Sequence, residues 1–407
     1  MPLRPVFDKA LVFAAIFLAL MPAGSPRAEI DTDFEAILSH GAISNLFNDS
    51  NNVDDVYDAV KTEFGFYPFS NLVVNVENEY TYYEKTGGLS NFFGKGGFTF
   101  IPTREESPLS IYLTGLFGSR VYRDDFRSYN NDVYDAGLFL GYQVNSFLNL
   151  RTGISYNEEV YTNEGDDRQS EDEIQTTFDI PADNKTYEFI IGANASLGGF
   201  AAIDLEAGFE TMALRYVSPP TDSMFDISVG DFILRNYLNP NKDTLREGDL
   251  EAVYFSPRLS YQLGSKLGLN IIFIYRNFKN PDRIIIPGLS TRFLSPWAAV
   301  YEGSALALNV KTFLVPGFIV TFGSGYWYKD FLIGEEEKVR RLLPDFIITD
   351  RHDEQNKVYI SIQKPFKLKS GLHLEAVLLL DHSHNQSSND YYDHDRQSIS
   401  AAINLRI

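Results

Sequence analysis

The segment Leu267-Gly-Leu-Asn-Ile-Ile-Phe-Ile-Tyr275 is apolar at every second position. One face of this segment is apolar along its whole length, with Leu267, Leu269, Ile271, Phe273 and Tyr275. The opposite face carries Asn270 and is followed by Arg276. A repeat of two residues predicts a β-strand that has one apolar and one polar face. The same alternation recurs in segments 109–120, 357–366 and 372–381, so strands of this kind extend over the whole chain.

The predicted strands are more numerous and longer than those of an ordinary soluble sheet, whose strands average five or six residues. We expect sixteen, at residues 36–47, 55–67, 71–84, 94–103, 109–122, 132–145, 147–162, 185–197, 200–216, 250–263, 267–280, 298–314, 317–330, 356–366, 371–385 and 395–407. Residues 31–38 are compatible with a short helix instead, which leaves fifteen strands, or fourteen strands and a periplasmic segment, as the alternative.

The predicted connections alternate between tight turns and long loops. Tight connections fall at 68–70, 146 and 264–266, whereas 163–184 and 217–249 are long. Short turns at one end and long loops at the other are typical of a transmembrane antiparallel up-and-down β-barrel whose termini lie at the short-turn end. The sequence therefore predicts an all-β fold of this type, with short periplasmic turns and long extracellular loops.

The composition excludes several classes of protein. The 407 residues contain no cysteine, which removes disulfide scaffolds and thiolate zinc sites. Asp and Glu number 55 against 35 Lys and Arg, so the net charge of −20 argues against binding to nucleic acid. Aromatic residues reach 14%, and no apolar run approaches the roughly 20 residues that a membrane-spanning helix needs.

The N-terminus has the pattern of a secretory signal peptide. Arg4 and Lys9 precede an apolar run from Leu11 to Met21, and small residues up to Ala28 follow. This order predicts export and removal of the segment. We therefore expect a signal peptide at 1–28 and an outer-membrane barrel at 29–407.

The C-terminal segment resembles the last strand of Gram-negative outer-membrane β-barrels of the porin type. Ala401, Ile403, Leu405 and Ile407 alternate with more polar positions, although Ile407 departs from the terminal Phe or Trp of that superfamily. The resemblance implies location in the Gram-negative outer membrane and contact with its lipid and the barrel-assembly machinery. Residues 43–51 and 53–57 also resemble barrels associated with exopolysaccharide export.

The polar faces of the predicted strands supply the candidate pore lining. It comprises Glu77, Glu79, Arg120, Arg151, Glu188, Asp204, Glu206, Glu210, Arg258, Arg276, Lys311, Lys357 and Glu375. Such charges require water, because Arg or Lys facing lipid near the midplane costs about 2–4 kcal/mol. They form either a selectivity lining, with the arginines facing the acidic cluster at 204–210, or ion pairs that fill a plugged barrel.

Other clusters give weaker signals. His382 and His384 share a strand face and His394 returns on the next strand, a spacing compatible with metal binding, although solvated residues at a loop end are the simpler interpretation. The acidic run at 163–173 is typical of a solvated loop. Residues 334–343 predict a helix that folds inward or lies on the surface.

We expect a non-enzymatic channel for passive diffusion of small hydrophilic solutes or ions, without a cofactor, because the sequence has no nucleophile motif, metalloprotease motif or phosphate-binding loop. The alternative is a barrel that serves an exopolysaccharide-export or surface-attachment system. A homo-oligomer is compatible with either function.

Overall fold

The computed structural model describes residues 31–46, 52–104, 106–161, 183–215, 250–279, 301–331, 351–367, 372–388 and 390–407. These residues form sixteen strands: β1 (Asp31–Ile43), β2 (Asp55–Phe69), β3 (Leu72–Tyr83), β4 (Asn91–Phe100), β5 (Leu109–Tyr122), β6 (Asn131–Asn145), β7 (Leu148–Tyr161), β8 (Asp183–Leu197), β9 (Ala201–Arg215), β10 (Leu250–Leu263), β11 (Leu267–Phe278), β12 (Tyr301–Thr312), β13 (Ile319–Phe331), β14 (Arg351–Lys367), β15 (His373–Ser387) and β16 (His394–Arg406). Short 3₁₀ helices are η1 (Gly87–Leu89), η2 (Asp124–Tyr129) and η8 (Asp390–Tyr392).

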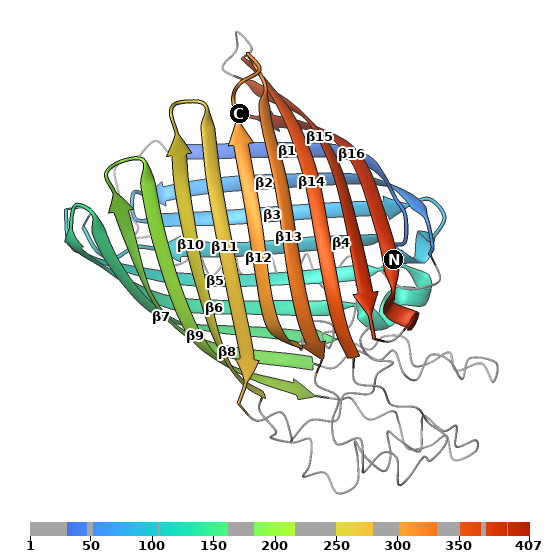
Figure 1. The fold of residues 1–407 in the computed structure, drawn as a ribbon, viewed down its shortest axis with the longest axis horizontal. Coiled ribbons are helices and arrows are strands. Elements are labelled where there is room, and N and C mark those ends of the chain that lie inside the picture. The colour runs from blue at the N-terminus through green and yellow to red at the C-terminus, as the bar shows by residue number, and fades with distance from the viewer. Residues whose placement is uncertain are drawn as a thin grey trace, which may run out of the picture.

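The strands form one closed antiparallel barrel in which each strand pairs with its neighbours in sequence (Figure 1). The seam between β1 and β16 closes it, from Glu35 opposite Arg406 to Ile43 opposite Ser398. The predicted sixteen-strand barrel is confirmed. Residues 31–38 belong to β1, so neither the helical alternative for that segment nor the count of fourteen strands holds.

The strands are long and tilted. They range from 10 residues in β4 to 17 in β14, against the 9–11 residues that cross the apolar part of a bilayer. In Figure 1 the strands of the near wall cross those of the far wall steeply, which is the tilt that barrel closure imposes. Every strand except β4 is longer than that crossing length.

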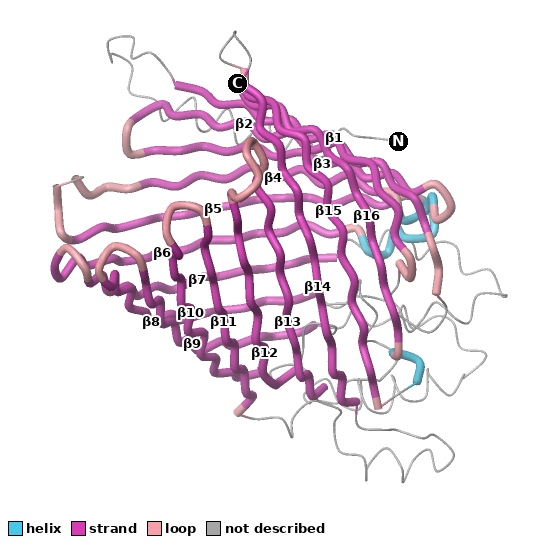
Figure 2. The backbone as a smooth tube through the Cα atoms, turned by 45° about the horizontal axis from the view of Figure 1, so that its top comes forward, coloured by secondary structure: helices cyan, strands magenta, loops and turns pink. Residues whose placement is uncertain are grey.

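Both ends of the described chain lie at the short-turn end of the barrel. The backbone N–H of Ile407 donates to the carbonyl of Phe34 at 2.9 Å, and the N–H of Phe34 donates back at 3.2 Å. Seven short connections join strands at this end, where Figure 2 shows short turns. The strand ends between β7 and β8, β9 and β10, β11 and β12, and β13 and β14, which are separated by more residues in the sequence, share the other end. We call the latter the loop end.

Side chains along each strand alternate between two faces of the wall. Large apolar side chains on one face are strongly exposed, for example Ile154 at 55%, Leu306 at 53% and Ile403 at 51%. Such side chains gain stability only against a hydrocarbon layer. Sixteen strands carry this apolar face around the barrel, as a membrane-inserted barrel requires.

No helix within the described residues has the length and hydropathy needed to cross a membrane. The predicted signal peptide (1–28), the acidic run (163–173), the loop at 217–249 and the predicted helix (334–343) lie outside the described residues.

Candidate functional site

The inward face of the barrel is identified by contacts that skip a strand, because side chains converge only on the concave side. The hydroxyl of Tyr254 on β10 donates to Glu188 on β8 at 2.7 Å. Arg151 on β7 reaches Asp204 on β9 at 2.6 Å. Neighbouring positions on the same strands, such as Phe255 at 43% exposure, point the other way.

The strand register places all thirteen predicted lining residues on this inward face. They are Glu77 and Glu79 on β3, Arg120 on β5, Arg151 on β7, Glu188 on β8, Asp204, Glu206 and Glu210 on β9, Arg258 on β10, Arg276 on β11, Lys311 on β12, Lys357 on β14 and Glu375 on β15.

One network joins the inward faces of β7 to β9. The Arg151 guanidinium donates through Nη1 to Asp204 at 2.6 Å and through Nη2 to Glu206 at 2.8 Å. Gly192 on the intervening β8 makes this crossing possible, because a Cβ there would lie 2.8 Å from Nε of Arg151. Charge-assisted bonds of this kind are short and fix the orientation of the guanidinium.

The Tyr254 side chain on β10 reaches across β9 to β8, beside the crossing of Arg151. Its ring lies over Gly208 on β9, where a Cβ would come within 2.2 Å of the ring. The hydroxyl then reaches Glu188, which also accepts a hydrogen bond from Ser155 at 3.0 Å. Tyr359 on β14 lies over Gly323 in the same way and donates to Asn309 on β12 at 2.8 Å.

Arg151, Arg258 and Arg276 lie within two strands of the acidic cluster on β9 and do not face it across the lumen. Arg276 pairs with Glu210 at 2.8 Å, and Arg258 stands directly opposite Asp204 in the register of β9 and β10. Arg120 lies over the Phe93 ring at 4.6 Å. The predicted arrangement, in which arginines face the cluster at 204–210 across the lumen, therefore differs from the structure, where Arg151 and Arg276 pair within that cluster.

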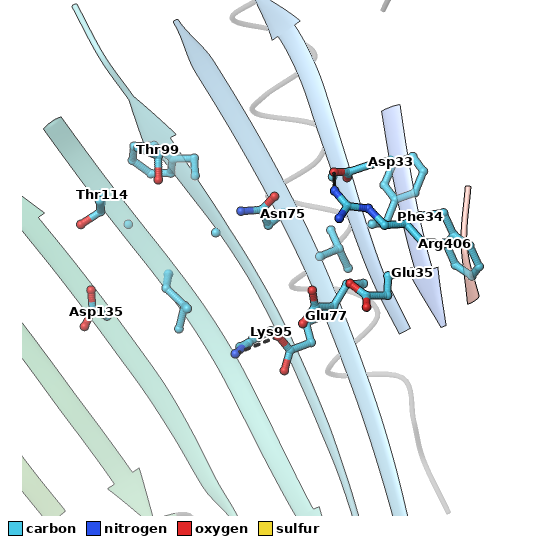
Figure 3. A pocket seen from close by; sticks show the side chains of 18 residues that line it. Asp33, Phe34, Glu35, Asn75, Glu77, Lys95, Thr99, Thr114, Asp135 and Arg406 are labelled. Atoms are coloured by element: carbon cyan, nitrogen blue, oxygen red, sulfur yellow. Dashed lines mark ion pairs between the residues drawn. The ribbon is translucent and has the colours of Figure 1, made fainter. Parts of the chain in front are cut away.

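A second charged network lines a recess on the inward faces of β1 to β6 (Figure 3). Lys61 approaches Glu63 at 2.7 Å and Glu77 at 3.4 Å, and Lys95 approaches Glu77 at 3.1 Å. Asp135 and Glu35 line the same recess, on either side of Lys95 and Glu77 in the view of Figure 3. Lys61, Glu63, Lys95 and Asp135 are absent from the predicted lining, although their period-two positions could have identified them.

Charge is divided between two walls of the barrel. Among the described inward-facing residues, β1 to β9 carry twelve carboxylates and four cations. The carboxylates are Asp33, Glu35, Asp55, Glu63, Glu77, Glu79, Asp135, Glu159, Glu188, Asp204, Glu206 and Glu210. The cations are Lys61, Lys95, Arg120 and Arg151. Strands β10 to β16 carry three carboxylates and seven cations, namely Asp353, Glu375 and Asp381 with Arg258, Arg276, Lys311, Lys329, Lys357, Arg396 and Arg406. We call these the acidic wall and the basic wall.

A packed apolar cluster, which we call the shelf, lies against the inward face of the acidic wall at the loop end. Inward-facing residues at strand ends form an apolar cluster with residues of three loops: Ile43, Leu46, Leu89, Tyr122, Tyr129 and Tyr161, with Tyr57, Tyr83 and Phe126 against them. Asp55 is 2% exposed and accepts backbone N–H groups of Val56, Lys85 and Thr86 at 2.7 to 2.9 Å. The N–H of Arg123 donates to Ser90, which ties the neighbouring loop to the shelf.

The predicted metal ligands do not converge. His382 and His384 share the outward face of β15, whereas His394 stands opposite Asn385 and faces inward. The Nδ1 atom of His394 lies 2.8 Å from the carbonyl oxygen of Tyr392, and His384 pairs with Asp395. Within the described part of the chain, no three His, Asp or Glu side chains are grouped as metal ligands.

Comparisons with known proteins give likenesses of overall shape alone. No protein-family description matches the chain, and no curated protein is significantly similar to it. Solved structures that resemble it are OccAB3 of Acinetobacter baumannii, at a TM-score of 0.47 and 9% identity, and OccK8 (OprE) of Pseudomonas aeruginosa, at 0.46 and 10%. The outer membrane protein OpdK of Pseudomonas aeruginosa gives 0.47 and 9%. The matches cover 93% of this chain and 98–100% of those chains.

Proposed function

We propose that this protein is an outer-membrane channel through which small hydrophilic solutes diffuse passively, without covalent chemistry or a cofactor. The observation that carries the proposal is the closed sixteen-strand barrel whose inward face is divided into an acidic and a basic wall. Barrels of 16–18 strands are wide enough to hold an aqueous channel. Unlike charges on facing walls produce a field across that water.

The field favours solutes that carry charge or a large dipole. A polar solute can align with the two walls and exchange its hydration for contacts with their side chains, whereas an apolar solute gains nothing to offset the loss of water. The described lining has more carboxylates than cations, so we expect a weak preference for cations over anions.

Ion pairs within the lining reduce the expected preference for cations but do not remove it. Arg151 and Arg276 each neutralise part of the cluster at 204–210, and their side chains are 33% and 19% exposed. Only half of the twelve described carboxylates of the acidic wall pair with a Lys or Arg, and the wall carries four cations, so it keeps an excess of negative charge.

Liposome swelling tests the proposal directly. Vesicles that contain the full chain are moved into isotonic solutions of sugars and amino acids of increasing size. Swelling that slows as solute size increases supports passive diffusion through a water-filled lumen. Vesicles that behave like protein-free vesicles would contradict the channel and favour a plugged barrel that acts through export partners.

A further inference from the structure

Four of the six histidines in the sequence lie on the outward face of the barrel near the loop end. They are His40 on β1, His352 on β14, and His382 and His384 on β15. Their strands and the partner strands β13, β16 and β2 are contiguous around the closed barrel. The four residues therefore occupy one sector of the outer wall.

Three of these histidines pair with an aspartate directly opposite on a neighbouring strand. His40 Nδ1 lies 2.8 Å from Asp58, and His384 Nδ1 lies 2.8 Å from Asp395. His352 Nδ1 lies 2.9 Å from Asp330. The pair of His40 and Asp58 is 68% and 66% exposed, so these groups are open to the surroundings of the barrel.

Other charged groups lie near these histidines on the outward face. His382 stands opposite Gln397, and Glu354 follows His352 on the same outward face. We define the histidine rim as His40, His352, His382 and His384 with Asp58, Asp330, Glu354 and Asp395. Among the described outward-facing positions of β13 to β2, no Lys or Arg occurs near the loop end. The other side of the barrel carries Lys185, paired with Glu158 at 2.6 Å, and Lys279.

The rim lies where the apolar face ends. On β16 the outward residues Ile399, Ala401 and Ile403 are followed toward the loop end by Gln397 and Asp395. On β1, Leu38 is followed by His40. In an inserted barrel, polar residues at this edge lie at the depth of the lipid head groups of the outer leaflet.

From this placement, we propose that the histidine rim is a proton-dependent contact surface for phosphate-bearing lipid head groups of the outer leaflet. Imidazoles as a class gain a proton between pH 5 and 8. With neutral imidazoles the rim carries four carboxylates and repels phosphate. With four imidazolium groups its formal charge rises from −4 to 0, and each ring nitrogen Nε2 can donate to a phosphate oxygen.

The charge of the rim thus depends on its imidazoles, because the described outward-facing positions of this sector carry no Lys or Arg near the loop end. A rim built from histidines makes lipid contact depend on pH. The aspartate partners of three of these histidines fix the orientation of the imidazole through Nδ1. Lipid contact at the rim rests on the outer-membrane insertion proposed above, but it does not require that the lumen conduct.

The test uses the full chain in mixed detergent micelles with phosphatidylglycerol or phosphatidylcholine, at about pH 5.5 and about pH 8. We measure bound lipid per barrel after gel filtration. Binding of phosphatidylglycerol is expected to be about tenfold stronger at the lower pH, because each cation near an anionic head group contributes about fivefold and the carboxylates offset part of it. Binding of phosphatidylcholine should not change.

Two variants and one control make the result specific. The variant H40Q/H352Q/H382Q/H384Q should lose the pH dependence, and H40K/H352K/H382K/H384K should bind phosphatidylglycerol strongly at both pH values. The control E158Q/K185Q, on the opposite side, should keep the wild-type dependence. Heat-modifiable migration on gels verifies that each variant is folded.

Three outcomes would overturn the inference. Unchanged pH dependence in the Gln variant would place the responsible groups elsewhere. Loss of binding in the presence of a chelator would show a cation bridge in place of protonated histidine. Competition by inorganic phosphate at concentrations similar to those of the lipid would show that the rim does not select lipid.

Discussion

Gly192 leaves open the space through which Arg151 crosses β8 to reach β9. A Cβ at position 192 would lie 2.8 Å from Nε of Arg151 and 2.9 Å from the carbonyl oxygen of Leu205. The glycine thus determines that Arg151 pairs with Asp204 and Glu206, which belong to a strand that β7 does not contact through its backbone. A residue without a side chain here organises the ion-pair network that links β7 to β9 on the acidic wall.

Substitution of Gly192 by Ala should displace the Arg151 side chain and break this network. We expect a loss of about 1–3 kcal/mol, typical of a steric insertion into a packed site. The midpoint of urea unfolding in lipid vesicles measures it. Gly268 also faces inward, but a Cβ there would meet nothing closer than 3.9 Å, so Gly268→Ala is the matched control. Equal effects of the two substitutions would contradict this role of Gly192.

Tyr254→Phe removes the hydroxyl that links β10 to Glu188 and, at 3.4 Å, to Glu206. Glu188 keeps its bond from Ser155, so we expect a modest loss of about 1 kcal/mol. Thermal unfolding by circular dichroism checks the value. Tyr261→Phe, on the outward face of the same strand, should change stability less. A larger loss for Tyr261→Phe would argue against the Tyr254 link.

The triple variant D204N/E206Q/E210Q removes three negative charges from the acidic wall and frees Arg151 and Arg276. The preference for cations should fall or reverse, because the local charge changes sign. Reversal potentials under a salt gradient measure this preference. Glu158→Gln removes a carboxylate from the outward face and is expected to leave selectivity unchanged. An unaltered reversal potential in the triple variant would show that ions do not pass this cluster.

Asp55→Ala should loosen the shelf, because three backbone N–H groups lose their acceptor. A buried carboxylate that accepts several such bonds contributes about 1–3 kcal/mol. Limited trypsin digestion reports the change as faster cleavage after Lys85. Glu84→Ala alters an exposed neighbour and should leave the cleavage rate as in the wild type. Slow cleavage in both variants would mean that Asp55 does not hold the loop.

Period-two alternation was enough to predict the barrel and the faces of its strands. In residues 267–275 each side chain is assigned to a face by counting alone, and the thirteen predicted lining residues all stand at inward-facing positions. Residues 31–38 are compatible with either a strand or a short helix when the sequence is considered alone. The backbone bonds to β16 and β2 decide that segment, and such pairing is not encoded locally.

The contacts between lining residues could not be predicted. The ion pair of Arg151 with Asp204 depends on the register of β7, β8 and β9 and on the absence of a side chain at Gly192. The spacing of charged residues along the sequence reveals neither. The packed cluster of the shelf could not be predicted for a similar reason. Tyr57, Tyr83, Tyr122 and Tyr161 stand at strand ends, where aromatic residues usually form the interfacial girdle. Only the inward face and the adjoining loops identify them as a packed cluster.

Single-channel recording in a planar bilayer tests the central claim most directly. We expect the purified full chain to give stable conductance steps that scale with salt concentration, with a reversal potential that indicates a weak preference for cations. A correctly folded protein that inserts without any conductance would contradict the proposed channel.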